Sequence, residues 1–501
     1  MAEAIDADHM SDEDALMWNI EKDPVLRSTV VATALLDQRP DWDRLVRKIE
    51  AASRRVPRMR HRVVAPPFRL GPPRWVVDHD FDLDFHLRRF ELPKPSNHAA
   101  LLRAIEPILV DGFDRARPLW EMTLFEGLEG DRAALIVKFH HAMTDGVGGM
   151  QLAASLVDFS RDADHNTELP ETPLEEAISR FSLVGDAFVH GTRRWQALAR
   201  RIPEVSLVGA RHMVTNPVQA SKDAVHMSQS IAKMLRPATS PFSTIMTKRS
   251  LTRRVATLEI PTADLKAAAK RHGGTLNDAF VAAVLGGLKE YHDRRGASCE
   301  QLRMTMPINL RSSEAAGTGG NHWTPARFIV PLDILDVKER MSKVRQLVLS
   351  ERSEPALGLT GPLAGMLNRL PTSTVTAIFG GLLKGVDFIT SNVPGAPIPV
   401  FLAGAEMTQM FAFAPPAGAG VNVTLVSHNE TCCIGVVADG AALPDLDLFM
   451  DCLRQGIAEV TSTGVPDAPT AATTGATTAK KRRPSTTSKK ALPSTPRALG
   501  T

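Results

Sequence analysis

An apolar run, residues 133–139, ends directly in two histidines, His140 and His141. Successive side chains on an extended chain point to opposite faces, so only one of these imidazoles can face a given pocket. Asp145 follows four residues after His141, at a glycine that lets the chain turn sharply. Residues 147–157 then place apolar side chains on one helical face. The sequence therefore predicts a strand–loop–helix junction that can hold a histidine rigidly and yet leave it exposed.

An imidazole at such a junction can act as a general base near neutral pH, because its ordinary pKa is about 6.5. A nearby carboxylate such as that of Asp145 can fix its orientation or hold the loop. A buried pair of histidines is also a common structural feature, and that interpretation stays open at this point. A histidine and an aspartate four residues apart could also bind a metal, but no third ligand has metal-site spacing, so we expect no metal.

Three other patterns predict local structure. Residues 81–87 alternate apolar and polar side chains, which is typical of a half-buried strand. Residues 120–125 are apolar and precede the run before the histidines, with a glycine-containing segment between them, which indicates two strands joined by a turn. Residues 276–291 form a predicted helix, and Thr275 with Asp278 suits a capping box at its start.

These patterns divide the chain into four parts. We expect an α/β protein with an N-terminal domain at residues 1–160 and a long helical connector at residues 161–245. A second mixed domain follows at residues 246–460. Residues 461–501 are rich in Thr, Ala, Pro, Ser and Lys, cannot bury a core, and are expected to be a disordered basic tail.

The charge distribution argues against nucleic-acid binding. The formal net charge is +3, but seven of the 59 Lys and Arg residues lie in residues 480–501, which contain no Asp or Glu. The rest of the chain is therefore mildly acidic and has no general basic character that would suit a nucleic acid.

The cysteines, the first residues and the length of the apolar runs indicate where in the cell the protein lies. The four cysteines form no Cys-x-x-Cys pair, which fits a reducing cytoplasm. The first residues are acidic, unlike a secretory signal. No apolar run approaches the roughly 20 residues that span a bilayer. We expect a cytoplasmic protein that is not secreted and that can lie peripherally on the inner membrane or on lipid droplets.

The histidine motif and several later segments carry a family resemblance. His-His-x-x-x-Asp-Gly after an apolar strand resembles the signature of the CoA-dependent acyltransferase superfamily. Further segments, in order and together, resemble the bacterial wax ester synthase/diacylglycerol O-acyltransferase family over residues 10–460. Those segments are Arg117-Pro118-Leu119-Trp120-Glu121, Asn277-Asp278, Pro307-Ile308-Asn309-Leu310-Arg311, Ser391-Asn392-Val393-Pro394-Gly395 and Val421-Asn422-Val423-Thr424.

The resemblance implies both a fold and a reaction. The fold would be two similar chloramphenicol-acetyltransferase-like domains of mixed sheet and helix, with a central tunnel between them. His141 would be the general base, with His140 as support and Asp145 as an orienting residue. The reaction would form triacylglycerol from diacylglycerol, or wax esters from long-chain alcohols, with a long-chain acyl-CoA as donor substrate and no separate cofactor.

Asn277 is a further candidate site residue. It begins the helix predicted at residues 276–291 and shares a face with Val281, Val284 and Leu288. An amide at a helix N-terminus can stabilise an oxyanion or orient a substrate. Plain helix initiation together with Asp278 explains it equally well.

Two features bear on substrates. Five arginines lie close together, and such side chains suit the phosphates of CoA or of lipid headgroups, although a solvated charged face is the commoner explanation. They are Arg54, Arg55, Arg58, Arg60 and Arg62. Many members of the resembled family carry Pro-Met-His-Val where this chain has Pro24-Val25-Leu26-Arg27, so an acceptor preference does not carry over. An acyltransferase for another alcohol or amine, or an inactive lipid-binding relative, remains an alternative.

Overall fold

A computed structural model of the chain describes residues 9–67, 71–143, 155–163, 169–172, 185, 189, 192, 217–238, 240–309, 323–354 and 359–462. Met1–Thr463 form one compact unit, and Gly464–Thr501 are separate from it. The predicted basic tail lies outside the described residues except for Thr461 and Ser462, which end the last helix. Asp145 and most of the predicted helix behind it also lie outside them.

The first six-stranded sheet contains the predicted pair of strands before the histidines. β5 and β6 form an antiparallel hairpin with Trp120 opposite Phe139. Its turn places Gly130 and Asp131 at φ values of 78° and 59°, a left-handed conformation that tight hairpin turns require. In spatial order the sheet comprises β11 (Phe401–Leu402), β12 (Ala405–Phe413), β1 (Thr29–Leu36), β6 (Arg132–His140), β5 (Trp120–Leu128) and β4 (Leu87–Glu91).

The second six-stranded sheet comes from the C-terminal half of the chain. Its central strand, β13, is buried along almost its whole length, as expected for an apolar run covered on both faces. β13 pairs antiparallel with β14 and parallel with β10. In spatial order the sheet comprises β7 (Arg253–Pro261), β14 (Thr431–Asp439), β13 (Val421–His428), β10 (Phe388–Pro394), β8 (Gln301–Asn309) and β9 (Trp323–Pro331), and a small separate sheet pairs β2 (His61–Val64) with β3 (Arg74–Val77).

The helices include the predicted capped helix, α10, which runs over Leu276–Arg294. Thr275 accepts the Asp278 N–H while the Asp278 carboxylate accepts the Thr275 N–H, so the capping box is confirmed. No helix within the described ranges is long and apolar enough to cross a membrane. The others are α2 (Asp12–Ile20), α3 (Trp42–Arg55), α4 (Leu83–His86), α5 (His98–Val110), α8 (Pro217–Leu235), α9 (Thr262–Arg271), α11 (Val337–Arg352), α12 (Thr360–Leu367), α13 (Thr372–Leu383) and α14 (Leu446–Ser462), with short 3-10 turns η1 (Pro24–Leu26), η2 (Pro57–Arg60) and η4 (His141–Met143).

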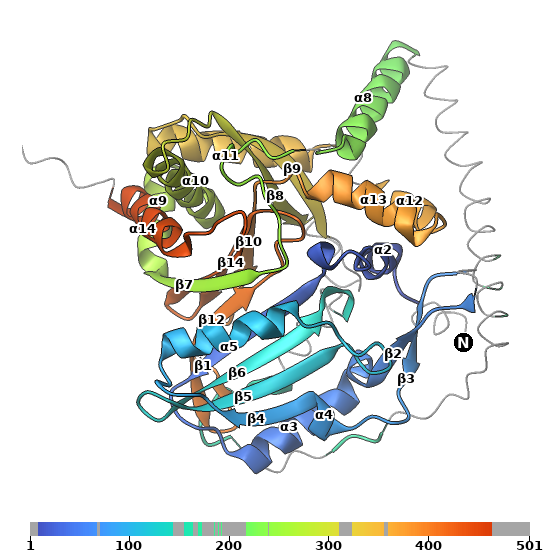
Figure 1. The fold of residues 1–501 in the computed structure, drawn as a ribbon, viewed down its shortest axis with the longest axis vertical. Helices are drawn as coiled ribbons and strands as arrows, with labels where there is room; N and C mark the ends of the chain where they lie inside the picture. The colour runs from blue at the N-terminus through green and yellow to red at the C-terminus, as the bar shows by residue number, and fades with distance from the viewer. Residues whose placement is uncertain are drawn as a thin grey trace, which may run out of the picture. The chain divides into compact units, whose positions relative to one another are not determined.

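The first sheet contains strands from both halves of the chain. β12 belongs to the C-terminal half but pairs with β1 in the first sheet (Figure 1). α5 packs between the sheets, and its apolar side chains join one cluster with β1, β6, β7 and β14. Gly435 on β14 allows β12 to lie close to β14, because a Cβ there would lie 2.3 Å from the Ala412 carbonyl oxygen of β12. The predicted second domain, residues 246–460, therefore contributes β11 and β12 to the sheet that carries His140.

The strand predicted at residues 81–87 is wrong in its first part. Leu83–His86 form the short helix α4, and the strand begins only at Leu87. The Asp82 carboxylate accepts the Asp84 N–H and so caps this helix. The turn brings His86 inward, where its ring stacks at 4.5 Å on Trp120 and its Nδ1 lies 2.6 Å from the Trp120 carbonyl oxygen. Alternation of apolar residues alone did not reveal this local capping.

The close approach at Gly435 predicts a large effect of one methyl group. We expect Gly435→Ala to lower the free energy of unfolding by about 1–3 kcal/mol, because β12 must move away from β14. Gly381→Ala in α13 is the matched control, since its added Cβ meets no atom within 4 Å. Urea or thermal unfolding followed by circular dichroism measures both. Equal stability of the two variants would contradict the argument.

Candidate active site

The two histidines lie where β6 ends and the 3-10 turn η4 begins. His140 is the last residue of β6 and is fully buried, with Thr29 of β1 opposite it. His141 is the first residue of η4 and is partly buried. The backbone N–H of His141 donates to the Ser28 carbonyl oxygen at 3.0 Å. The sheet therefore continues to hold the backbone one residue beyond the end of the strand.

Four groups surround the His140 ring. Its Nδ1 accepts the backbone N–H of Ala142 at 3.0 Å. Its Nε2 lies 3.0 Å from the Glu21 carboxylate, in a close polar contact whose angle falls short of an ideal hydrogen bond. Trp18 and Phe113 pack edge-on against the ring, with centroids at 5.6 and 6.1 Å. His140 is thus a buried support for the turn and not a group open to substrate.

His141 has the protonation state that a general base needs. Burial is the main cause that lowers the pKa of His141 to about 4, and the charge that His140 would carry if protonated acts in the same direction. The imidazole is therefore neutral at neutral pH, with a lone pair available to take a proton. Its low basicity means that proton transfer must accompany attack by the acceptor oxygen and not precede it.

An arginine from the predicted basic segment holds the same turn. Arg58 donates from Nη1 to the Ala142 carbonyl oxygen at 3.1 Å, and its guanidinium lies 5.0 Å from the Trp75 ring centroid. The other arginines of the segment do not gather into one phosphate site. Arg54 and Arg60 both pair with Glu50, at 2.7 and 2.6 Å.

Asn277 lies on a helix that covers the second sheet. It is partly buried in the first turn of α10, and its Nδ2 lies 3.6 Å from the Met306 sulfur on β8. The predicted neighbours on its helix face, Val281, Val284 and Leu288, are fully buried. The amide thus faces inward, but its chemical role stays a prediction, as does that of Asp145, which is outside the described residues.

Sequence reasoning missed the residues that hold the turn from the N-terminal side. Glu21 ends α2, and Ser28 directly precedes β1. Asp14 on α2 is also close enough for its charge to interact with His140 and Arg58. None of these residues belongs to a recognisable motif, because the two histidines lie more than 100 residues away from them in the chain. Only the register of β1 against β6 brings them together.

A pocket adjoins the segment that connects Glu21 to Ser28. Its volume is about 590 Å³, and it opens between η1 and α13. Lys384 pairs with Asp23 at 2.5 Å on its wall, and the Thr376 hydroxyl is buried there without a hydrogen-bond partner. Pro24, which directly precedes the three residues where the chain departs from the resembled family, is part of the lining. The lining residues are Lys22, Asp23, Pro24, Ser373, Thr376, Ala377, Gly380 and Lys384.

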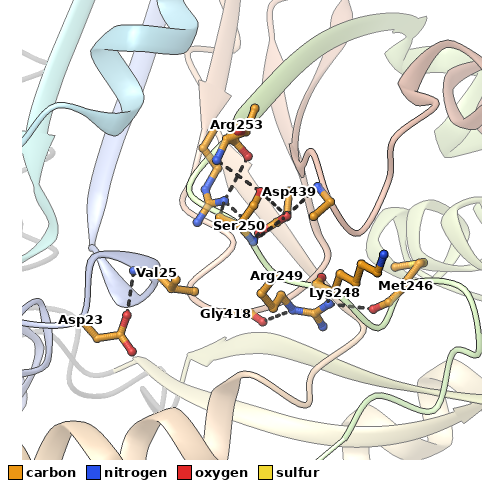
Figure 2. Close-up of polar contacts among 11 residues, drawn as sticks. Asp23, Val25, Met246, Lys248, Arg249, Ser250, Arg253, Gly418 and Asp439 are labelled. Atoms are coloured by element: carbon orange, nitrogen blue, oxygen red, sulfur yellow. Dashed lines mark hydrogen bonds and ion pairs between the residues drawn. The ribbon is translucent and has the colours of Figure 1, made fainter.

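The buried charges beside the start of β7 are paired with nearby groups. Figure 2 shows Asp439 accepting the Ser250 N–H at 2.8 Å and pairing with Arg253 at 3.0 Å. Arg249 donates to backbone carbonyls, including that of Gly418 at 2.6 Å. This cluster fixes the segment that enters β7, and it offers no group for chemistry. Across the described ranges, no three His, Cys, Asp or Glu side chains are arranged to hold a metal ion.

A second serine–histidine contact occurs away from the histidine turn. Ser243 Oγ lies 2.8 Å from His292 Nε2. Both residues are at most 1% exposed, and His292 Nδ1 faces the Leu288 carbonyl oxygen. A substrate cannot reach this hydroxyl, so the pair is structural.

Two domain profiles of one protein family match this chain. The profile of the wax ester synthase/diacylglycerol acyltransferase catalytic domain matches residues 10–280, and that of the C-terminal domain of the same family matches residues 319–461. The chain belongs to this family. It is accordingly an O-acyltransferase, and the predicted family and enzyme class are confirmed.

Relatives in the family match most of the chain. A Mycobacterium tuberculosis H37Rv protein, provisionally named a diacylglycerol O-acyltransferase, is 37% identical over 466 residues, covering 92% of this chain and 94% of the relative. Another protein of that strain, tgs1, with a similar provisional name, is 28% identical and covers 81% and 85%.

Solved structures confirm the predicted fold. The wax ester synthase/diacylglycerol acyltransferase of Marinobacter aquaeolei VT8 superposes with a TM-score of 0.57 at 23% identity, covering 90% of this chain and 98% of the other. The first condensation domain of the calcium-dependent antibiotic synthetase gives 0.58 at 16% identity, covering 91% and 96%. The family thus has the mixed α/β architecture of two sheets that the resemblance implied.

The lowered pKa of His141 predicts the acid side of the pH–rate profile. We expect kcat/KM to stay constant well below pH 6.5, because His141 remains neutral until the pH approaches about 4. Asp14 is the competing group, since burial raises its pKa to about 6. The profile is therefore measured in Asp14→Asn as well as in the wild type. A protonation step at or above pH 6.5 in both proteins would contradict the assignment.

Proposed function

We propose that this enzyme transfers a long-chain acyl group from acyl-CoA to the hydroxyl group of a lipid alcohol. The products would be triacylglycerol from diacylglycerol, wax esters from long-chain alcohols, or both. The observation that carries the proposal is a neutral His141 on a turn fixed by the backbone of β1 and by Arg58. The provisional names of the mycobacterial relatives support diacylglycerol as one acceptor.

The proposed reaction needs one base and no covalent acyl-enzyme. The lone pair of His141 takes the hydroxyl proton as the acceptor oxygen bonds to the thioester carbon. The tetrahedral intermediate then breaks its C–S bond, re-forms the carbonyl and releases CoA as a thiolate, which takes the proton from the imidazolium. Thiols have a pKa near 8.5, so the thiolate leaves readily. Asn277 is proposed to orient the substrate or its oxyanion, and Asp145 to orient the loop.

Acyl-CoA is proposed to serve as the donor substrate without a separate cofactor. The base and the leaving group together account for every proton and electron pair in the transfer. The resemblance also implies that donor and acceptor approach His141 through a tunnel from opposite sides. We include this approach of the two substrates from opposite sides in the proposal.

The decisive prediction concerns His141. Labelled long-chain acyl-CoA is offered to the purified protein with diacylglycerol, with a fatty alcohol or with no acceptor, and the labelled ester is separated and counted. We expect acceptor-dependent ester formation, and His141→Ala should lower kcat by roughly 10²–10⁴-fold through loss of the base.

His226→Ala, at an exposed position of α8, is the matched histidine control and should retain full activity. Ester formation that survives His141→Ala would refute the mechanism. No ester from any lipid alcohol would favour another alcohol or amine acceptor, and no acyl transfer at all would favour a lipid-binding protein.

We also propose that the enzyme works at a lipid surface, since its acceptors dissolve poorly in water. Apolar side chains on α12 and α13 and on the link between them support this: Met366, Leu370 and Ile378 are 66%, 38% and 36% exposed. Arg369 stands among them and suits an anionic headgroup. The same helix, α13, lines the pocket beside the segment that follows Glu21.

Flotation with vesicles that contain anionic phospholipid tests this surface. We expect the double variant Met366→Glu/Ile378→Glu to lower the bound fraction at least several-fold, because two carboxylates would have to enter the interface. Leu335→Glu is the control, since Leu335 is 70% exposed on the link between β9 and α11. Equal binding of wild type and double variant would reject α12 and α13 as the contact.

A further inference from the structure

Glu21 connects to the backbone on both sides of His141. Its Oε1 accepts the Ser28 N–H at 2.7 Å, and the Ser28 carbonyl oxygen accepts the His141 N–H at 3.0 Å. The same Oε1 lies 3.0 Å from His140 Nε2, and His140 Nδ1 accepts the Ala142 N–H at 3.0 Å. Two series of contacts therefore begin at Glu21 Oε1. One runs through Ser28 to the His141 N–H, and the other runs through His140 to the Ala142 N–H.

The contacts from Glu21 through His140 to Ala142 depend on which nitrogen of His140 carries the proton. His140 Nδ1 can accept the Ala142 N–H only if it carries no hydrogen, so neutral His140 must carry its proton on Nε2. That Nε2 lies 3.0 Å from the Glu21 carboxylate, the contact described above whose angle falls short of an ideal hydrogen bond. In the other tautomer an Nδ1–H would oppose the Ala142 N–H, two donors 3.0 Å apart. A hydrogen-bond acceptor at position 21 selects the tautomer that supports the turn.

The surroundings of Glu21 keep it ionised. Its side chain is 10% exposed, and burial alone would raise its pKa. The His140 contact, the Ser28 N–H and the Arg115 charge outweigh burial and lower the pKa of Glu21 below its ordinary value. Arg115 lies 3.5 Å from Oε2, on the side away from His140. Asp14, the other buried carboxyl near His140, exchanges hydrogen bonds with Ser11 instead.

We propose that Glu21 is a positioning residue for acyl transfer, which holds the His141 turn by selecting the His140 tautomer and by binding the Ser28 N–H. It does not touch the substrate, and it acts only through His140 and the backbone. The inference rests on the proposed function for its activity readout. It goes beyond that function because it gives a positioning role to Glu21 at the end of α2, outside the histidine motif.

Two substitutions at position 21 separate hydrogen bonding from charge. In Glu21→Gln the amide oxygen can still accept from Ser28 and His140 while its NH₂ turns toward half-exposed Arg115, so we expect kcat within about threefold of wild type. Glu21→Leu fills similar space without an acceptor, and we expect kcat to fall at least tenfold. KM for acyl-CoA should change less than threefold in both, because no substrate contact is lost.

Two substitutions of His140 provide a second, independent test. The side-chain oxygen of Asn can take the place of Nδ1, so His140→Asn should accept the Ala142 N–H and keep at least tenfold more kcat than His140→Leu. This pair keeps the inference testable if Glu21→Leu fails to fold. Glu126→Leu is the matched control, since Glu126 is an equally buried carboxylate on β5 that pairs with Arg89 at 2.8 Å. Its kcat per folded molecule should equal that of wild type.

Each outcome decides one question. Folded Glu21→Leu with wild-type kcat, or an equal loss in Glu21→Gln and Glu21→Leu, would overturn the positioning role. If Glu21→Leu does not fold, equal kcat in His140→Asn and His140→Leu would overturn it. Absence of acyl transfer in the wild type would instead refute the proposed function, so the two failures remain distinguishable.

Discussion

The register of β1 between two partner strands is the constraint on which both the fold and the site depend. β1 pairs with β6 along its whole length, and Thr29 stands opposite His140. Its other edge pairs with β12 from the C-terminal half. Side chains alternate with period two, so a slip of one residue against β6 would turn the apolar residues of β1 to the wrong faces and move Ser28 away from His141. The packing that joins the halves and the geometry of the base are therefore set by the same pairing.

His141 and Glu21 are both partly buried near the same turn, but His141 is neutral whereas Glu21 is charged. His141 loses its proton readily because burial disfavours the imidazolium. Glu21 keeps its charge because several donors converge on it. A buried carboxylate without such donors would cost several kcal/mol, so its charge persists only where N–H groups are already directed at it. One side of the turn thus holds a fixed anion, and the other a neutral base.

The sequence predicted elements whose signals are local. The β5–β6 pair and the capping box of Thr275 both follow from apolar runs, turn residues or capping within a few positions. The strand predicted at residues 81–87 was wrong because Asp82 caps a short helix there despite the alternation of apolar and polar residues. The insertion of β12 beside β1, and the contact of Glu21 with His140, join positions far apart in the chain. No local pattern encodes such pairings, so the motif pointed to the two histidines but not to the residues that hold them.

The segment between Glu21 and Ser28 has two different neighbours. Its ends hold the histidine turn, through the Glu21 carboxylate and the Ser28 carbonyl oxygen. Its middle faces α13, where Leu26 packs with Val375 and Pro24 lines the pocket. Because the Ser28 N–H binds Glu21 directly, the two ends are tied together and the intervening residues form a closed loop. Side chains in that loop can therefore differ from those of other family members, and reshape the pocket, while the hydrogen bonds that fix the base stay intact.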